Sequence, residues 1–184
     1  MVRSHATIES RRAYTGRVIS VDLDRVRFPD GSEGELELIR HPGASAVLPF
    51  LSDPKVGDPQ VLLIRQYRYA ANSFIDEIPA GRLEAGEDPI ICARRELLEE
   101  TGCSAGQLEL LTTIHTTPGF TDERIHLYMA SQLTQGDMSR ESDEFIEVQS
   151  FRLSDVLEMV GGGQITDGKT IVAVLYSAGF RLGR

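Results

Sequence analysis

Residues 81–103 read GRLEAGEDPIICARRELLEETGC, and this stretch is the most informative part of the sequence. It contains the signals of a capped helix. Asp88 is a favoured N-cap residue, Pro89 suits the first helical position, and Gly102 suits the left-handed position after the last turn. We therefore expect a helix from Pro89 onward, and we expect the strand before it to end at residues 79–81.

This helix and the loop before it carry four glutamates: Glu87, Glu96, Glu99 and Glu100. At about 100° per residue, Glu96 and Glu100 lie close together on one helix face, and like charges at this spacing weaken a helix. A bound cation would compensate for the repulsion, because Mg²⁺ prefers carboxylate oxygens and also binds phosphates. The alternative is a solvated acidic face on which Arg94 and Arg95 supply the opposite charges.

The rest of the chain alternates between short apolar runs and loops marked by proline or glycine. We expect strands over residues 61–64, 74–78, 108–115, 125–129 and 145–151, a polar surface loop over 131–143, and helices capped by Ser154 and Asp167. Residues 14–39 predict an antiparallel β-hairpin. Because helices and strands do not follow a strict βαβ repeat, the fold class expected is α/β (α+β) with a mixed sheet. Residues 1–42 would form an N-terminal β extension and residues 43–184 the main domain.

The glutamate stretch resembles the Nudix box, G-x5-E-x7-R-E-U-x-E-E-x-G-U, in which U is a bulky apolar residue. The matching positions are Gly81, Glu87, Arg95, Glu96, Leu97, Glu99, Glu100, Gly102 and Cys103. The one departure is Cys103, where a small thiol is a tolerable substitute. The resemblance implies a Nudix hydrolase, an α/β/α sandwich with a mixed sheet that cleaves a nucleoside diphosphate linked to another group.

The same resemblance implies a metal site. Glu96 and Glu100 would be the principal ligands, together with the backbone carbonyl of Ala80. Glu99, which would have a catalytic role, is a further candidate ligand, and Arg95 would orient the glutamates. The expected cation is Mg²⁺, with Mn²⁺ as a substitute.

A second set of motifs resembles the ADP-ribose pyrophosphatase branch of this family. In that branch a proline follows the box, and here Pro118 lies fifteen residues after Cys103. The other matching stretches are residues 65–68, 77–81, 117–124 and 174–176. The likeness assigns substrate binding to Arg68, Glu84, Gly119 and Glu123. An arginine such as Arg68 can hold a diphosphate through two hydrogen bonds, and the alternative for it is surface charge at a strand end.

The general base has to be a further residue, because glutamates bound to metal have their lone pairs occupied. In the ADP-ribose pyrophosphatase branch it is a glutamate on a loop before the penultimate strand, and the matching position is Glu144. Glu141 and Asp143 are close enough in sequence to be rivals. A base on a loop can close over the substrate.

The composition limits the classes of function. The chain has 184 residues, with 19 Lys and Arg against 28 Asp and Glu, and its net charge of −9 argues against nucleic-acid or anionic-membrane partners. Two cysteines are too few for a disulfide scaffold. An apolar signal segment and an uncharged run of bilayer length are both absent from the sequence. We therefore expect a cytoplasmic protein that binds a small molecule.

These features together predict Mg²⁺-dependent hydrolysis of ADP-ribose to AMP and ribose 5-phosphate. Two alternatives stay open: a broader nucleoside diphosphate-sugar hydrolase of the same family, and a catalytically silent Nudix domain that only binds its ligand. The hairpin over residues 14–39 is too small to bury both of its faces. Proteins of the resembling branch are homodimers joined through this part, so a homodimer is expected.

Overall fold

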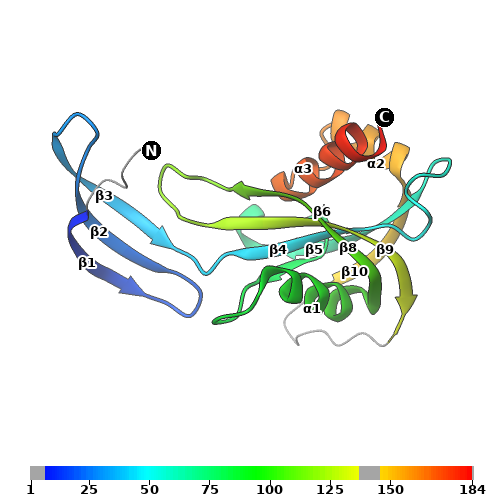
Figure 1. The fold of residues 1–184 in the computed structure, drawn as a ribbon, viewed down its shortest axis with the longest axis horizontal. Helices are drawn as coiled ribbons and strands as arrows, with labels where there is room; N and C mark the ends of the chain where they lie inside the picture. Colours follow the sequence, from blue (N-terminus) through cyan, green and yellow to red (C-terminus); the bar gives the residue numbers. More distant parts are fainter. Residues whose placement is uncertain (1–6, 137–145, 184) are drawn as a thin grey trace. The chain divides into compact units, whose positions relative to one another are not determined.

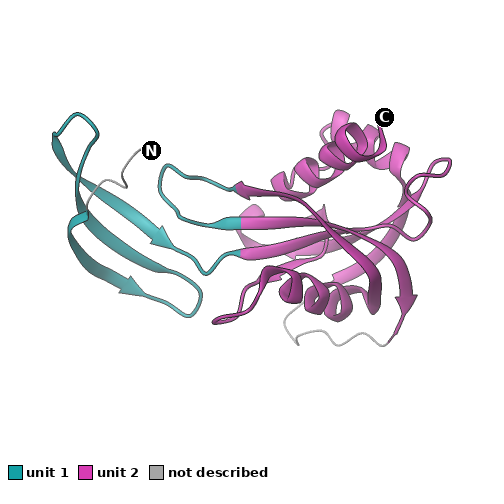
Figure 2. Ribbon diagram, in the orientation of Figure 1, with its two compact units in different colours: residues 1–43, 115–124 teal, residues 44–114, 125–184 magenta. Residues whose placement is uncertain are grey.

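The structure is a computed structural model that describes residues 7–136 and 146–183. The chain forms two compact units (Figure 2). The first contains the described residues up to Gly43 together with His115–Arg124, and the second contains Ala44–Ile114 and the described part of Ile125–Arg184.

The first unit is a three-stranded antiparallel sheet in the order β1 (Thr7–Thr15), β2 (Ser20–Arg27) and β3 (Glu33–Arg40). The antiparallel extension is confirmed, and β2 and β3 form the expected hairpin. The structure adds β1, which the sequence analysis missed because its residues are mostly polar and exposed. A turn in which the amide of Gly16 donates to the Ile19 carbonyl at 2.9 Å separates β1 from β2.

The second unit contains two sheets. One has the antiparallel order β10–β5–β6, and the other has the order β7–β4–β9–β8, with β4 parallel to β9 and antiparallel to β7. Their strands are β4 (Ala44–Pro49), β5 (Gln60–Arg68), β6 (Ser73–Glu77), β7 (Ala80–Arg82), β8 (Cys103–His115), β9 (Arg124–Gln135) and β10 (Ile146–Arg152). The expectation of a mixed sheet is thus confirmed.

Helix α1 (Pro89–Thr101) covers one side of these sheets, and α2 (Leu153–Gly161) and α3 (Gly168–Tyr176) cover the other (Figure 1). Short helical turns, η1 (Tyr69–Ala71) and η2 (Ser177–Leu182), follow β5 and α3. Neighbouring residues of a strand pack on opposite sides: Leu62 joins the cluster around α1, and Leu63 joins the cluster around α2 and α3. This arrangement is the expected α/β/α sandwich. Among the described helices, none is both long and apolar enough to cross a membrane.

Two local expectations were wrong. Strand β9 continues through residues 131–135, which were expected in a loop. This part of the strand is polar and lies at the surface, so it lacks the apolar run from which a strand is predicted. Helix α2 begins at Leu153 with Arg152 as its N-cap, so Ser154 is not the cap. Instead, the Ser154 hydroxyl donates a 2.6 Å hydrogen bond to Asp58, which ties the helix to the loop before β5.

Candidate active site

Helix α1 has both of the caps that its sequence predicts. The Asp88 carboxylate accepts a hydrogen bond from the amide of Ile90 at 3.0 Å, which satisfies a free donor of the first turn. Gly102 ends the helix with a φ of 71°, and its amide donates to the Leu98 carbonyl. These caps fix where the helix begins and ends, and therefore which glutamates share a face.

Two glutamates of α1 face strand β7. Glu96 is 8% exposed and Glu100 is 1% exposed, which is rare for carboxylates. The amide of Ala80 donates to Glu100 Oε2 at 2.9 Å. The predicted pair is therefore brought together next to the main chain of residue 80, as the sequence pattern required.

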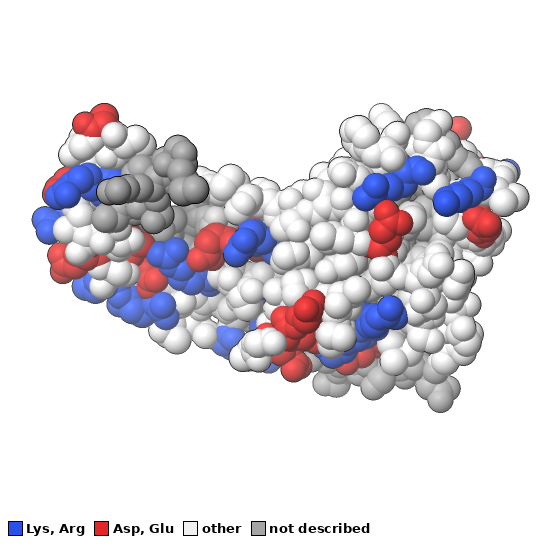
Figure 3. All heavy atoms as spheres, viewed as in Figure 1, with Lys and Arg blue, Asp and Glu red and all other residues white. Residues whose placement is uncertain are grey.

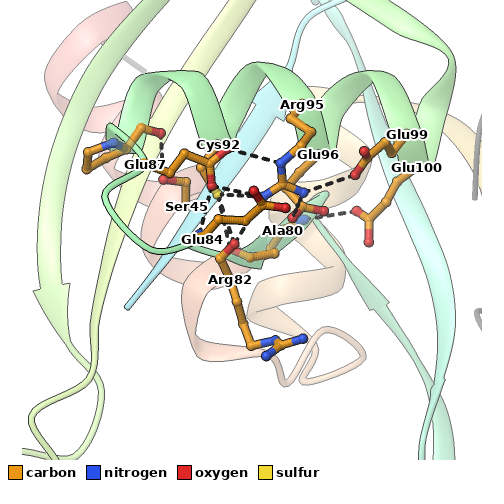
Figure 4. A network of polar contacts seen from close by, with 12 residues as sticks. Ser45, Ala80, Arg82, Glu84, Glu87, Cys92, Arg95, Glu96, Glu99 and Glu100 are labelled. Carbon is orange, nitrogen blue, oxygen red and sulfur yellow. Dashed lines mark hydrogen bonds and ion pairs between the residues drawn. The ribbon is translucent and has the colours of Figure 1, made fainter. Parts of the chain in front are cut away.

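Arg95 stands at the centre of the glutamate cluster (Figure 4). Its guanidinium donates to Glu87 Oε1 at 3.0 Å, to Glu96 Oε1 at 2.6 Å and to Glu99 Oε2 at 3.0 Å, as well as to the Arg82 carbonyl. The hydrogen bonds from Arg95 hold the pKa of Glu87 below its usual range, and the same pairing raises the pKa of Arg95. Arg95 thus orients the glutamates, as expected, and supplies much of the positive charge that they need.

The neighbouring arginine does not share this role. Arg94 donates to the carbonyl of Ala105 at 2.7 Å, outside the carboxylate cluster. The alternative in which both arginines neutralise an acidic helix face is therefore only half right. Burial of Glu96 and Glu100 also contradicts a fully solvated face.

Gly81 is required by space and not by its backbone angles. A Cβ at this position would lie 1.8 Å from Glu96 Oε1 and 2.0 Å from its Cδ. The bare main chain of β7 therefore lets the Glu96 carboxylate lie directly against it. This close approach brings the main chain of β7 and the carboxylates of α1 into one site.

Cys92 lies in the same cluster, and its side chain is buried. Its Sγ contacts the carbonyls of Gly81 and Arg82 at 3.5 and 3.4 Å. Burial, with the charges of Glu87 and Glu96, raises the pKa of the thiol to about 11. The reactive thiolate is therefore almost absent at neutral pH.

Arg68 and Lys169 flank a second buried carboxylate, Glu77. Arg68 Nε and Nη2 donate to the two Glu77 oxygens at 2.8 and 2.9 Å, and Lys169 forms an ion pair with Glu77 as well. Burial alone would raise the pKa of Glu77, but the hydrogen bonds from Arg68 and the charge of Lys169 outweigh it and lower the pKa. The pKa of Arg68 is raised, first by Glu77 and further by the charges of Glu100 and Asp167.

The main chain of residues 78–80 is held from three directions. The amide of Ile78 donates to Thr170 Oγ1 of α3 at 2.9 Å, and the Pro79 carbonyl accepts from the amide of Val47 of β4 at 2.9 Å. The amide of Ala80 is bound to Glu100 of α1. Helices from both layers of the sandwich therefore fix the position of one short loop.

Comparison with known proteins identifies the family. The family model described as "NUDIX domain" matches residues 40–171 of this chain. The chain belongs to the Nudix family. The resemblance of the glutamate stretch to the Nudix box is thereby confirmed.

Several Nudix relatives match most of the chain. A "Methanol dehydrogenase activator" of Bacillus methanolicus is 40% identical, and an "ADP-ribose pyrophosphatase" of Bacillus subtilis (strain 168) is 38% identical; each match covers 92% of this chain and 90% of the relative. A "GDP-mannose pyrophosphatase" of Salmonella paratyphi B (strain ATCC BAA-1250 / SPB7) is 33% identical with the same coverage. The crystal structure of an "ADP compounds hydrolase" has the same fold, with a TM-score of 0.80, 18% identity, and coverage of 98% of this chain and 95% of that one.

The other predicted site residues lie at different places. The amide of Glu84 donates to Glu87 Oε2 at 2.9 Å at the start of the Nudix box. Gly119 and Glu123 belong to the first compact unit, where Glu123 accepts from the Thr116 hydroxyl at 2.8 Å. Glu144, with its rivals Glu141 and Asp143, lies outside the described residues.

The donors in the Nudix box suit a hard divalent cation. Glu96 and Glu100 offer buried carboxylate oxygens on adjacent turns, and the absence of a side chain at Gly81 leaves the β7 main chain next to them. Within residues 7–136 and 146–183, no three Asp, Glu, His or Cys side chains form a complete ligand set.

Acidic and basic side chains are mixed on the surface of the second compact unit, which contains the Nudix box. On the face drawn in Figure 3, its acidic and basic side chains lie in small mixed groups separated by uncharged surface. A duplex-binding surface would instead need a continuous row of Lys and Arg.

The roles of Glu77, Lys169 and Thr170 were not predicted from the sequence. Glu77 stood in a stretch that resembles the family, but no partner was predicted for it. The signal was the charge itself, because an acidic residue at the end of a buried strand requires a cation nearby. Its partner Lys169 is 92 residues away, so local spacing could not identify it.

Proposed function

We propose that this chain hydrolyses ADP-ribose to AMP and ribose 5-phosphate with Mg²⁺, for which Mn²⁺ can substitute. The observation that carries the proposal is the buried pair Glu96 and Glu100 against the Ala80 main chain, in a chain 38% identical to an ADP-ribose pyrophosphatase. A second relative of that name, from Mycobacterium tuberculosis (strain ATCC 25618 / H37Rv), is 30% identical over 92% of this chain.

In this proposal the metal is held by Glu96, Glu100 and the carbonyl of Ala80. When bound, a divalent cation neutralises diphosphate charge and acidifies a water molecule. Arg95 keeps the carboxylates in place, and Glu99, which it also binds, has the catalytic role. Three anchors on residues 78–80 hold the Ala80 carbonyl at a fixed position.

Arg68 supports the substrate diphosphate in this proposal. Its Nε and Nη2 donate to Glu77, and a guanidinium has five N–H donors, so this pairing does not use all of them. Because Glu77 fixes the plane of the guanidinium, the remaining donors point in a defined direction without further loss of side-chain entropy. Arg68 thus offers an oriented positive group for a phosphate oxygen.

The roles of four further residues rest on the resemblance to the ADP-ribose pyrophosphatase branch. Glu144 would accept the proton of the attacking water, and Glu84, Gly119 and Glu123 would bind the substrate. Exchange of Glu144, Asp143 and Glu141 one at a time for the amide or Ala identifies the base. The true base is the residue whose loss depresses kcat most without weakening substrate binding.

A broader nucleoside diphosphate-sugar hydrolase is the second candidate. It is favoured by the GDP-mannose pyrophosphatase relative, which matches this chain over 92% of its length. A silent binding module is less well supported, because all four glutamates of the box, Glu87, Glu96, Glu99 and Glu100, are present.

We infer that the chain is a homodimer joined through its N-terminal extension. Strand β1 has one neighbour, β2, in its sheet and is exposed along nearly its whole length. An unpaired edge of this kind is a site for pairing with another chain. Light scattering of the full chain tests this inference, and a monomeric mass at micromolar concentration would contradict it.

A substrate panel tests the activity. ADP-ribose, GDP-mannose, UDP-glucose and diadenosine polyphosphates are compared with Mg²⁺, Mn²⁺ or a chelator, and the products are identified by chromatography. We expect AMP and ribose 5-phosphate from ADP-ribose as the fastest reaction, and none with the chelator. Faster hydrolysis of GDP-mannose would favour the broader enzyme, and no hydrolysis of any compound would favour the binding module.

A further inference from the structure

Gln66 carries a buried side-chain oxygen that has no hydrogen-bond partner among the described residues. It lies on β5, is 7% exposed, and its Oε1 accepts no hydrogen bond from any residue that the structure describes. The sheet register pairs it with Ile146 of β10 and Ile75 of β6, so its cross-strand neighbours are apolar. Such a group reduces stability relative to an apolar side chain of the same size.

Strand geometry places Gln66 on the same face of β5 as Arg68 and Leu62, because alternate residues of a strand share a face. Leu62 belongs to the same buried cluster as Ala93 and Leu97 of α1, the helix that carries the metal-site glutamates. Arg68 is held by Glu77 and is affected by the charge of Glu100. Gln66 therefore lies between the core beneath α1 and the arginine assigned to the diphosphate.

The chemistry of the unpaired atom restricts its partner. A carbonyl oxygen can only accept, so it cannot bind a phosphate oxygen or a metal-site carboxylate. It requires an O–H or N–H group, and beside a diphosphate linked to sugars such groups are sugar hydroxyls and water. The Arg68 donors and the Gln66 acceptor are thus complementary to a phosphate oxygen and to an adjacent O–H group.

We propose that Gln66 is a substrate-contacting residue whose side-chain carbonyl accepts a hydrogen bond from an O–H group next to the substrate diphosphate. The inference rests on the proposed function and adds a specific contact to that site. The O–H group is either a ribose hydroxyl of the ligand or the attacking water. The two sources predict different kinetic effects.

The test is Gln66→Met, which keeps the volume and removes the acceptor. Because the Gln66 Oε1 accepts no hydrogen bond from the described residues, the thermal midpoint without ligand should be unchanged or higher. If a ribose hydroxyl is the donor, the Kd for ADP-ribose measured in chelator by calorimetry should rise about tenfold. If water is the donor, kcat should fall about tenfold with an unchanged Kd.

Gln149→Met is the matched control. Gln149 lies on the adjacent strand β10, is half-buried, and is paired in register with Leu63, which packs on the opposite side of the sheet. The Gln149→Met variant should have a Kd and a kcat within about twofold of the wild-type values. Gln66→Leu provides a second variant if the Met variant folds poorly.

Two results would overturn the proposal for Gln66. One is a Gln66→Met or Gln66→Leu protein with wild-type Kd and kcat. The other is a clear fall in the thermal midpoint with kinetic losses that only follow the folded fraction, which would show a structural role. Failure of the proposed function is distinguishable, because it appears in the wild type as a lack of ADP-ribose hydrolysis, and the Kd measurement in chelator does not require turnover.

Discussion

The amide of Ile78 donates a 2.9 Å hydrogen bond to Thr170 Oγ1, a residue 92 positions later in the chain. The Thr170 hydroxyl donates in turn to Asp167, the N-cap of α3, at 2.5 Å. The first turn of α3 therefore holds the main chain at Ile78, two residues before Ala80, whose carbonyl is the proposed metal ligand. A helix that contributes no residue to the Nudix box thus positions part of its proposed metal site.

Thr170→Val should reduce stability without changing the shape of the side chain. It leaves the amide of Ile78 buried without its acceptor and removes a donor to Asp167. The expected loss is about 1–3 kcal/mol in the free energy of unfolding, measured by urea denaturation. Thr134→Val, on an exposed position of β9, is the control and should change stability little. Equal stability of both variants would show that the Ile78 contact contributes nothing.

Glu77→Gln should make the protein less stable at neutral pH, because Arg68 and Lys169 lose their shared carboxylate. The expected loss at pH 7 is about 3–5 kcal/mol. Since the folded pKa of Glu77 lies below the reference value of 4.5, the unfolded chain binds the proton more readily, and this stabilisation is present above pH 4.5. It is lost as the pH falls through the lowered folded pKa.

The pH dependence distinguishes this ion pair from a general loss of packing. Urea unfolding of the wild type and of Glu77→Gln between pH 3 and pH 7 should give two curves that converge toward the acidic end. Glu158→Gln, at an exposed position of α2, should follow the wild type throughout. A constant difference across the pH range would refute the assignment of the effect to the Glu77 charge.

Gly81→Ala should damage the site by displacing a carboxylate. The added Cβ would overlap Glu96, so the Glu96 side chain or strand β7 has to move. A shift of about 1 Å at a catalytic group costs about a hundredfold in rate. Steady-state kinetics measure this loss, and Gly161→Ala is the control, because a Cβ there meets no atom within 4 Å. Wild-type turnover of Gly81→Ala would exclude the close approach as a requirement for catalysis.

Glu100→Gln should abolish most activity and leave the fold intact. The amide oxygen of Gln can still accept from the Ala80 amide, whereas the charge that would bind a metal is gone. Removal of a residue that only hydrogen-bonds to a metal ligand lowers activity about 10–100-fold. Loss of the ligand itself should lower kcat by more than this. Stability without metal should be equal or higher, because repulsion within the cluster falls.

The measurements for Glu100→Gln are kcat against Mg²⁺ concentration and the thermal midpoint in chelator. Glu158→Gln again serves as the control for loss of one carboxylate. A Glu100→Gln enzyme with wild-type turnover at limiting Mg²⁺ would contradict the ligand assignment.

The features that sequence analysis predicted correctly are local. The Asp88 and Gly102 caps, the face shared by Glu96 and Glu100, and the orienting role of Arg95 all depend on residues within a few helical turns. Cap preferences and the helical repeat act over such distances, so spacing alone was sufficient. The family was predicted from the resemblance of this stretch to the Nudix box, and the mixed sheet was predicted from the order of the apolar runs and helices.

Sequence spacing could not predict the features that join distant parts of the chain. The partners of Glu77, the anchor of Ile78 on Thr170 and the missing partner of Gln66 depend on sheet register, on the packing of α3, and on burial. Strand β1 was missed because polar side chains on an exposed strand carry no apolar pattern. A buried charge needs an ion-pair partner, and a buried oxygen without a hydrogen bond suggests a ligand contact. Both depend on burial, which arises only when all layers of the fold pack together.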